Sequence, residues 1–113
     1  MIYIVYKHTC IISGKSYIGY TCQGMIKRWN NEIIHSRNIK NKHKLDNALR
    51  KYPDQFWKHE ILINDISKLK QIKKLEIEMI AKFDTFNNGY NSNPGGSGIG
   101  KHSKKLKKKY LKH

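Results

Sequence analysis

The stretch IYIVYKHTCIISGKSYIGY, residues 2–20, is the part of the sequence that most strongly indicates the fold. Residues 2–8 and 15–20 are rich in Ile, Val and Tyr, which is typical of β-strands, and Ser13-Gly14 marks a turn between them. The connection is longer than a two-residue turn, so we expect a loose or bulged hairpin. The chain therefore begins with two antiparallel strands.

Helical periodicity follows over residues 25–37, 45–52 and 66–83, with Phe56 to Ile63 as a third strand. The apolar stripes are Ile26, Trp29 and Ile33; then Leu45, Ala48, Leu49 and Tyr52; then Ile66, Leu69, Ile72, Leu75, Met79, Ile80 and Phe83. Asp65 is the expected N-cap of the longest helix. The pattern predicts an α/β domain with a small antiparallel three-stranded sheet flanked by helices, at residues 1–96, and a basic extension at 97–113.

The charge of the chain favours a polyanionic partner. Lys and Arg number 23 against 8 acidic residues, for a net charge of +15. Residues 101–113 hold seven lysines and no acid, so residues 1–100 keep a charge of +8. A strongly basic folded body is typical of proteins that bind nucleic acid. A membrane surface is the main rival, but no long basic amphipathic helix with aromatic anchors is present. The start of the chain lacks the features of a signal peptide, so we expect an intracellular protein.

Glu76 is the most informative acidic residue. On the predicted helix it lies about 40° from both Ile72 and Ile80, inside the apolar stripe, whereas Glu78 points to the far side. A carboxylate on a core-facing stripe is costly unless it is paired, protonated or bound to a metal. Two interpretations stay open at this point, a salt bridge to a lysine and a ligand for Mg²⁺.

Arg28 lies beside the apolar stripe of the first helix, where it is either an ordinary solvated basic residue or a group that binds a phosphate through two parallel hydrogen bonds. Cys10 and Cys22 flank the hairpin, and we expect both to be free thiols. Zinc binding by these cysteines would need two further ligands at suitable spacing, and no such pattern is present.

Several motifs together resemble the GIY-YIG nuclease superfamily. Any one piece is weak, but five pieces in the right order, with compatible spacing, cover residues 1–96. The pieces are Tyr6-Lys7-His8-Thr9 with Ser13-Gly14-Lys15-Ser16-Tyr17-Ile18-Gly19; Lys27-Arg28-Trp29; Glu76; Gly89-Tyr90-Asn91; and Asn93-Pro94-Gly95-Gly96.

The resemblance implies hydrolysis of a phosphodiester in double-stranded DNA by a homing- or restriction-like endonuclease, leaving 5′-phosphate and 3′-hydroxyl ends. It implies Mg²⁺ or Mn²⁺ as cofactor and a monomer or weak homodimer as the working unit. The residues carried over are Tyr6 and Tyr17 as the motif tyrosines, Gly19 as the motif glycine, Arg28 as the phosphate contact, Glu76 as the metal ligand and Asn91 as a supporting residue.

The sequence departs from the family pattern at three places. The first motif lacks its glycine, and the interval from Tyr17 to Arg28 is one residue longer than is common. Glu32 stands where many family members carry a histidine. His35 and Lys15 are other basic candidates near the site, although the helical rise puts His35 about 10 Å from Arg28. The identity of the general base is therefore left open.

The C-terminal lysines resemble the short DNA-binding modules that follow this nuclease domain in phage and intron-encoded homing endonucleases. Electrostatically they would add affinity that depends on salt and not on sequence. The candidates are Lys101, Lys104, Lys105, Lys107 and Lys108. Two alternatives to an active nuclease are a catalytically impaired nucleic-acid-binding module on the same fold and an assembly protein held on RNA by its charge.

Overall fold

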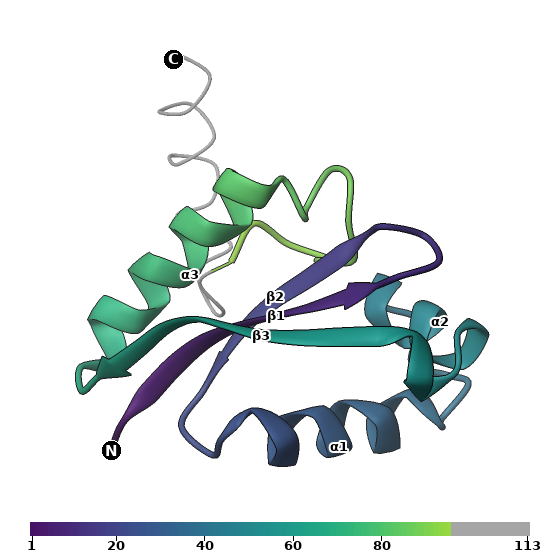
Figure 1. The fold of residues 1–113 in the computed structure, drawn as a ribbon, viewed down its shortest axis with the longest axis horizontal. Coiled ribbons are helices and arrows are strands. Elements are labelled where there is room, and N and C mark those ends of the chain that lie inside the picture. The colour runs from purple at the N-terminus through teal and green to yellow at the C-terminus, as the bar shows by residue number, and fades with distance from the viewer. Residues whose placement is uncertain (96–113) are drawn as a thin grey trace.

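The computed structural model describes residues 1–95 of the chain. Within that range three strands form one antiparallel sheet in the order β2-β1-β3, with α-helices on both faces (Figure 1). The strands are β1 (Tyr3–Cys10), β2 (Ser16–Thr21) and β3 (Trp57–Ile66); the helices are α1 (Met25–Ser36), α2 (Lys44–Lys51) and α3 (Leu69–Phe83); and a 3-10 turn at Asp54–Phe56 leads into β3. This arrangement confirms the predicted α/β fold class.

The β1–β2 hairpin brings the two motif tyrosines to one face of the sheet. Tyr6 lies opposite Gly19, and His8 lies opposite Tyr17. The backbone N–H of Cys10 donates to the carbonyl of Lys15 at 2.9 Å, so the connection is longer than two residues, as expected. Both strands end later than predicted, because Cys10 of β1 still pairs with Trp57 of β3, and Thr21 of β2 still pairs with Ile4 of β1.

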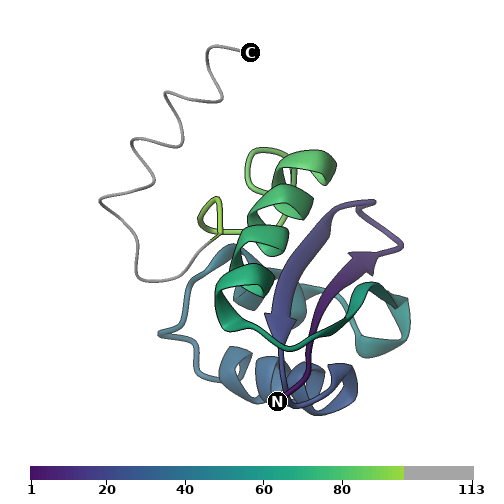
Figure 2. The same cartoon turned by 90° about the vertical axis from the view of Figure 1, so that its left-hand side faces the viewer.

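Strand alternation divides the interior into two layers, one on each face of the sheet. Figure 2 shows α3 on one side of the sheet and α1 on the other. The layer under α3 is an apolar cluster of Val5, Ile18, Ile72 and Ile80. The layer under α1 and α2 holds Cys10, Trp29, Leu45, Ala48, Trp57 and Tyr90. Tyr6 and His8, which share this second face, are fully buried beside that cluster.

The inward face of α1 differs from the predicted stripe. Trp29 is buried as expected, but Ile26 is 75% exposed. The buried positions of the helix are Trp29, Glu32 and Ser36, so its inner face is largely polar. The side chains of Glu32 and Ser36 form hydrogen bonds and are not part of the aliphatic core. The spacing of apolar residues cannot predict buried positions of this kind.

The longest helix begins three residues later than predicted. β3 extends to Ile66, which pairs with Tyr3 of β1, so α3 starts at Leu69 with Lys68 as its N-cap. Asp65 is therefore not the cap; it lies in the strand with a φ of 60°. Because β3 continues to pair with β1 as far as Ile66, Asp65 and Ile66 belong to the strand and not to the helix.

The buried face of α3 contains Ile72, Glu76 and Ile80, which confirms the inward placement of the carboxylate. Leu69 and Phe83, at the two ends of the predicted stripe, are 44% and 39% exposed. Glu76 is only 9% exposed. Because burying a carboxylate is costly, this position implies a compensating interaction or a functional role.

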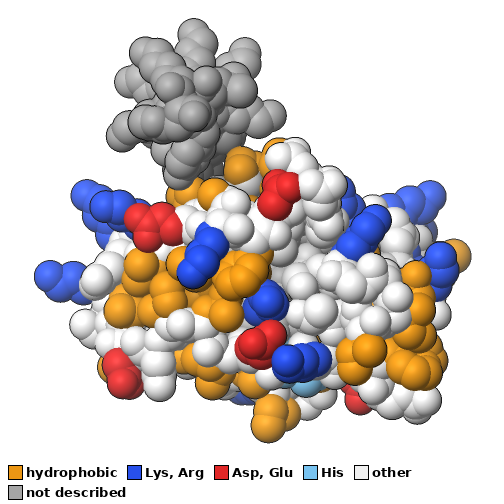
Figure 3. Space-filling model, turned by 45° about the horizontal axis from the view of Figure 1, so that its top comes forward, with side chains coloured by type: hydrophobic (Ala, Val, Ile, Leu, Met, Phe, Trp, Pro, Cys, Tyr) orange, Lys and Arg blue, Asp and Glu red, His pale blue; other side chains and the backbone are white. Residues whose placement is uncertain are grey.

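Positively charged side chains are distributed over the surface of the described residues, without one dominant patch on the face drawn in Figure 3. On the face drawn in Figure 3, Lys and Arg side chains stand around an apolar patch. Cys10 is a buried free thiol and Cys22 an exposed one, as expected. Among residues 1–95, no helix is long and apolar enough to cross a membrane.

Candidate active site

A cleft of about 610 Å³ opens beside β2, the outer strand of the sheet, where elements from both faces of the sheet meet. Its walls are Tyr17, Gly19 and Tyr20 of β2; Arg28, Asn31, Glu32 and His35 of α1; His43, Leu45 and Asp46 at the start of α2; Glu76 of α3; and Tyr90, Asn91, Ser92 and Asn93. The edge strand lets Glu76 approach the residues of α1, although α1 and α3 cover opposite faces. Of the eight site residues predicted within residues 1–95, six line the cleft, and Tyr6 and Lys15 do not.

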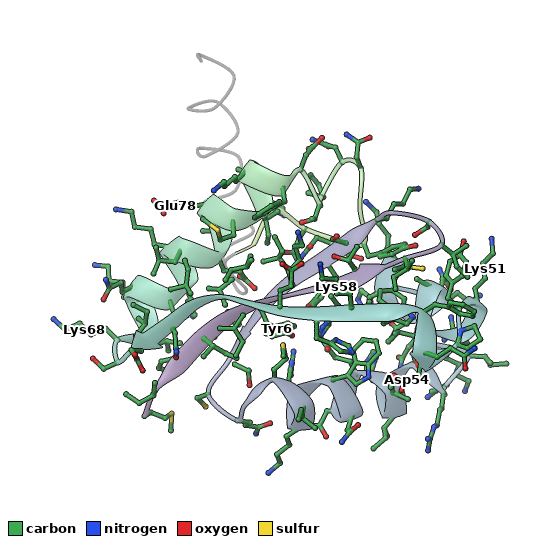
Figure 4. All side chains as sticks on the ribbon, in the orientation of Figure 1. Tyr6, Lys51, Asp54, Lys58, Lys68 and Glu78 are labelled. Carbon is green, nitrogen blue, oxygen red and sulfur yellow. The ribbon has the colours of Figure 1, made fainter. Side chains whose placement is uncertain are left out.

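Tyr6 connects two charged residues of α1. Its hydroxyl donates to Oε2 of Glu32 at 2.8 Å and accepts a hydrogen bond from Nε of Arg28 at 3.3 Å. Figure 4 labels Tyr6 on the side of the sheet that faces α1. Tyr6 is fully buried and does not line the cleft, so of the two motif tyrosines only Tyr17 faces it.

Arg28 presents a charged guanidinium to the cleft. Burial lowers the pKa of Arg28, but the hydrogen bond to Tyr6 and the negative charge of Glu32 outweigh that effect and leave the pKa above its usual range. The Nε atom lies 3.8 Å from Oε2 of Glu32, one turn along the helix. The arginine is therefore oriented by two neighbours and is a suitable phosphate contact.

Tyr17 shares the cleft with two carboxylates, Glu32 and Glu76. Burial raises the pKa of Tyr17, and the negative charges of Glu32 and Glu76 raise it further, while Arg28 lowers it by less. The ring centroids of Tyr17 and Tyr6 are 6.3 Å apart. At neutral pH the phenol keeps its proton and can donate a hydrogen bond into the cleft.

Gly19 is required by the position of Tyr6. A Cβ atom at Gly19 would lie 2.5 Å from the Tyr6 hydroxyl oxygen and 2.7 Å from Cζ. Those distances are below van der Waals contact, and the buried tyrosine has no space into which to move. The motif glycine therefore allows the tyrosine of the neighbouring strand to reach Glu32.

Asn91 closes the outer edge of β2. Its side-chain Oδ1 accepts from the backbone N–H of Ile18 at 2.9 Å, and its Nδ2 donates to the Ile18 carbonyl at 2.8 Å. The backbone N–H of Tyr90 also donates to the carbonyl of Ser16 at 2.8 Å. The late asparagine supports the cleft by holding this segment against the strand.

His35 does line the cleft, but it is engaged by Asp46. Its Nδ1 lies 2.8 Å from Oδ1 of Asp46, and Nδ1 of His43 lies 3.1 Å from Oδ2. Burial alone would raise the pKa of Asp46, but the hydrogen bonds from the two histidines lower it below its usual range. The aspartate thus orients both imidazoles on this wall.

Two groups of predicted residues lie elsewhere. Lys15 is exposed and lines a second, smaller pocket beside the hairpin, so it does not belong to the cleft. Lys15 precedes β2, at the turn end of the hairpin. Gly96 and the tail lysines Lys101, Lys104, Lys105, Lys107 and Lys108 lie outside the described residues, as does the extension at 97–113.

Comparison with solved structures reveals the fold. A mutant of the catalytic domain of the intron endonuclease I-TevI matches with a TM-score of 0.74 at 20% identity, covering 87% of this chain and all of that domain. A second structure, of the catalytic domain of the homing endonuclease I-TevI, matches with a TM-score of 0.68 at 20% identity, covering 79% of this chain and 96% of that one. This chain has the GIY-YIG fold. No family model and no curated protein matches the sequence.

On the GIY-YIG fold, this chain places two histidines behind the cleft that the sequence motifs did not reveal, the buried His8 and the partly buried His59. Nε2 of His8 lies 2.9 Å from Oε1 of Glu32, and Nδ1 of His8 lies 2.9 Å from Nδ1 of His59 on β3. Strand alternation was the available signal for His8, because it lies two residues after Tyr6 and so shares its face. Nothing in the sequence paired His59 with it.

The donor set of the GIY-YIG cleft fits a hard cation that is completed by substrate. Glu76 offers carboxylate oxygens at the wall of an open cleft. Within residues 1–95, no group of three or more His, Cys, Asp and Glu side chains forms a metal cage. Mg²⁺ is commonly held by one or two carboxylates together with substrate phosphates and water, and the arrangement suits that mode.

Proposed function

We propose that this chain is a metal-dependent DNA endonuclease that hydrolyses a phosphodiester and leaves 5′-phosphate and 3′-hydroxyl ends. In this proposal the enzyme is of the homing or restriction kind, and its substrate is double-stranded DNA. The solved structures that share its fold are named as endonuclease catalytic domains. The fold alone does not establish the chemistry, so the proposal depends on the residues of the cleft.

One observation carries the proposal: the cleft brings together Tyr17, Arg28 and Glu76 from β2, α1 and α3. A phosphodiester site needs a cation or a fixed positive charge near the phosphate oxygens, a proton donor or acceptor, and an anchor for a metal. Random surface placement would not gather these groups at one strand edge. The arrangement supports hydrolysis more than simple binding.

The residues have distinct roles in this proposal. Arg28 binds the phosphate undergoing attack and stabilises the negative charge that develops on it. Tyr17, which keeps its proton, donates a hydrogen bond to the bound DNA or to the attacking water. Glu76 would hold Mg²⁺ or Mn²⁺, and the bound cation would stabilise charge on the phosphate oxygens. Asn91 acts indirectly by holding the edge of β2.

The charge of the chain supports DNA as the substrate. The net charge of +15 provides sequence-independent attraction to phosphates, and the affinity should fall steeply with salt. The proposed catalytic cleft would cut one strand at a time, so double-strand cleavage would need two successive cuts or a pair of chains. The proposed working unit is therefore a monomer or a weak homodimer.

The experiment that tests this function uses supercoiled plasmid incubated with the full chain, with Mg²⁺, with Mn²⁺ or with EDTA. We expect nicked and then linear DNA with either metal, none with EDTA, and products that carry 5′-phosphates. Binding of the plasmid without cleavage under every metal condition would contradict the proposal and favour an impaired DNA-binding module. A clear preference for RNA over DNA at rising salt would favour an RNA-associated protein.

A further inference from the structure

Glu32 is a buried carboxylate that also lines the cleft. It is 8% exposed, and both of its oxygens are held from within the protein. Tyr6 donates to Oε2 at 2.8 Å, and Nε2 of His8 lies 2.9 Å from Oε1. Each carboxylate oxygen has two lone pairs, so neither contact exhausts its capacity to accept a proton. The carboxylate is thus both fixed in orientation and available to the cleft.

His8 can serve Glu32 only as a support. Its imidazole is fully buried, does not line the cleft and packs among the rings of Tyr6 and Trp29, each with its centroid 4.6 Å away. No substrate can reach it there. Its role is therefore to hold the carboxylate, as a second residue holds the reacting group in many catalytic pairs.

His59 supports His8 from the side away from Glu32, with 2.9 Å between the two Nδ1 atoms. Burial lowers the pKa of His59 and the neighbouring His8 lowers it further, so His59 is neutral at physiological pH. An ionised carboxylate can only accept, so Nε2 of His8 carries the hydrogen that Glu32 receives, and the contact between the two Nδ1 atoms holds the His8 ring in place. Glu32 is therefore the acceptor at the end of this row of side chains.

The two motif tyrosines are poor bases at neutral pH. Burial raises the pKa of Tyr6 well above its usual value, with Glu32 and Tyr17 adding to the rise. The pKa of Tyr17 is raised mainly by burial as well, so both phenols keep their protons. Among the other cleft groups, His35 is bound to Asp46. Of the other two carboxylates on the wall, Asp46 is bound to His35 and His43, and Glu76 is the proposed metal ligand, which leaves Glu32 as the candidate base.

We propose that Glu32 accepts the proton of the attacking water, and that Tyr6 and His8, backed by His59, position its carboxylate. This inference rests on the proposed endonuclease function. One O–H bond of the water breaks and its proton goes to a Glu32 oxygen, while the water oxygen forms a bond to phosphorus. The bond from phosphorus to O3′ breaks, O3′ takes a proton from solvent, and Glu32 later releases its proton through the cleft.

The test compares Glu32→Gln, which keeps the shape and removes the base, with Glu78→Gln as the matched control. Glu78 is exposed on the outer side of α3, as Figure 4 shows. Single-turnover cleavage is measured from acid to neutral pH at saturating metal and DNA. We expect Glu32→Gln to cut about 10²–10⁴-fold more slowly, with a DNA Kd within about threefold of wild type. Its rate should lose the fall at acid pH that the wild type and Glu78→Gln show.

The titratable or charged groups around Glu32 must be considered in reading that profile. They are Tyr6 and His8 on β1, Tyr17 on β2, Arg28 on its own helix, and His59 on β3 acting through His8. A Glu32→Gln variant that cuts within about threefold of wild type, with the same pH profile, would overturn the proposal. A wild type that never cuts would instead refute the function itself.

His8→Phe provides a second and independent readout, which also decides the matter if Glu32→Gln loses its native near-ultraviolet circular dichroism. Phenylalanine keeps the ring packing against Tyr6 and Trp29 but removes the donor to Glu32. Loss of a hydrogen bond to the charged form makes a carboxylate more basic, so the acid fall in rate should move to higher pH. An unmoved profile with wild-type turnover would show that His8 does not act on the base.

Discussion

Replacing Asn91 with alanine should open the edge of β2 and destabilise the whole domain. The side chain satisfies both backbone groups of Ile18, whose N–H and carbonyl point to the outer edge of the sheet. Ile18 is fully buried and Asn91 is 5% exposed, so solvent replaces these contacts poorly. The substitution therefore leaves one donor and one acceptor without their partners.

The magnitude follows from the number of groups affected. An unsatisfied buried donor or acceptor costs about 1–3 kcal/mol, so two such groups would cost roughly 2–6 kcal/mol. Water entering from the adjacent cleft offsets part of this, and we expect a loss of about 2–4 kcal/mol in the free energy of unfolding. A domain of this size commonly has only about 5–15 kcal/mol of stability, so the melting temperature should fall by roughly 10–25 °C.

Urea unfolding followed by tryptophan fluorescence measures this loss, with two comparison variants. Asn91→Asp keeps the acceptor for the Ile18 N–H but turns a nearly buried carboxylate oxygen toward the Ile18 carbonyl, so it should lose at least as much stability as Asn91→Ala. Asn87→Ala removes an exposed asparagine from the preceding turn and should change stability by less than about 0.5 kcal/mol. An Asn91→Ala protein within about 0.5 kcal/mol of wild type would refute the reasoning.

Three further predictions follow from other contacts. Gly19→Ala should cost about 1–3 kcal/mol, because its Cβ would lie 2.5 Å from the Tyr6 hydroxyl; an unchanged urea midpoint would argue against that contact. The raised pKa values of Tyr6 and Tyr17 mean that the folded state holds protons which the unfolded chain releases near pH 10. Stability should therefore be intact below about pH 10 and decline above it, less steeply in Tyr6→Phe, as urea titrations across that range would reveal. A chromogenic thiol reagent should modify Cys22 in the native protein and Cys10 only after unfolding; equal rates would contradict their burial.

The hairpin and the buried carboxylate of α3 could be predicted because each follows from a simple period. Alternation in residues 2–20 indicates two strands, and the positions of Ile72 and Ile80 place Glu76 between them on one face. Both inferences depend on local geometry alone. The cleft itself needed the third strand and the segment after α3, whose positions only the folded chain reveals.

The polar interior under α1 could not be predicted from apolar periodicity. A stripe through Ile26 seemed reasonable, but the helix turns Glu32 inward because Tyr6 and His8 supply donors for its carboxylate. A buried charge of this kind depends on partners that are 24 and 26 residues away in sequence. The late start of α3 has a similar origin, since pairing between Tyr3 and Ile66 extends β3.

The measurement that tests the central claim most directly compares plasmid cleavage by Glu76→Gln and Glu78→Gln with that of the wild type, with Mg²⁺ present. The two variants make the same chemical change on one helix, at a buried position in the cleft and at an exposed position outside it. We predict that Glu76→Gln binds DNA with nearly wild-type affinity but cuts at least about 10²-fold more slowly, while Glu78→Gln cuts like the wild type. Normal cleavage by Glu76→Gln would contradict the assignment of this cleft as the site of hydrolysis.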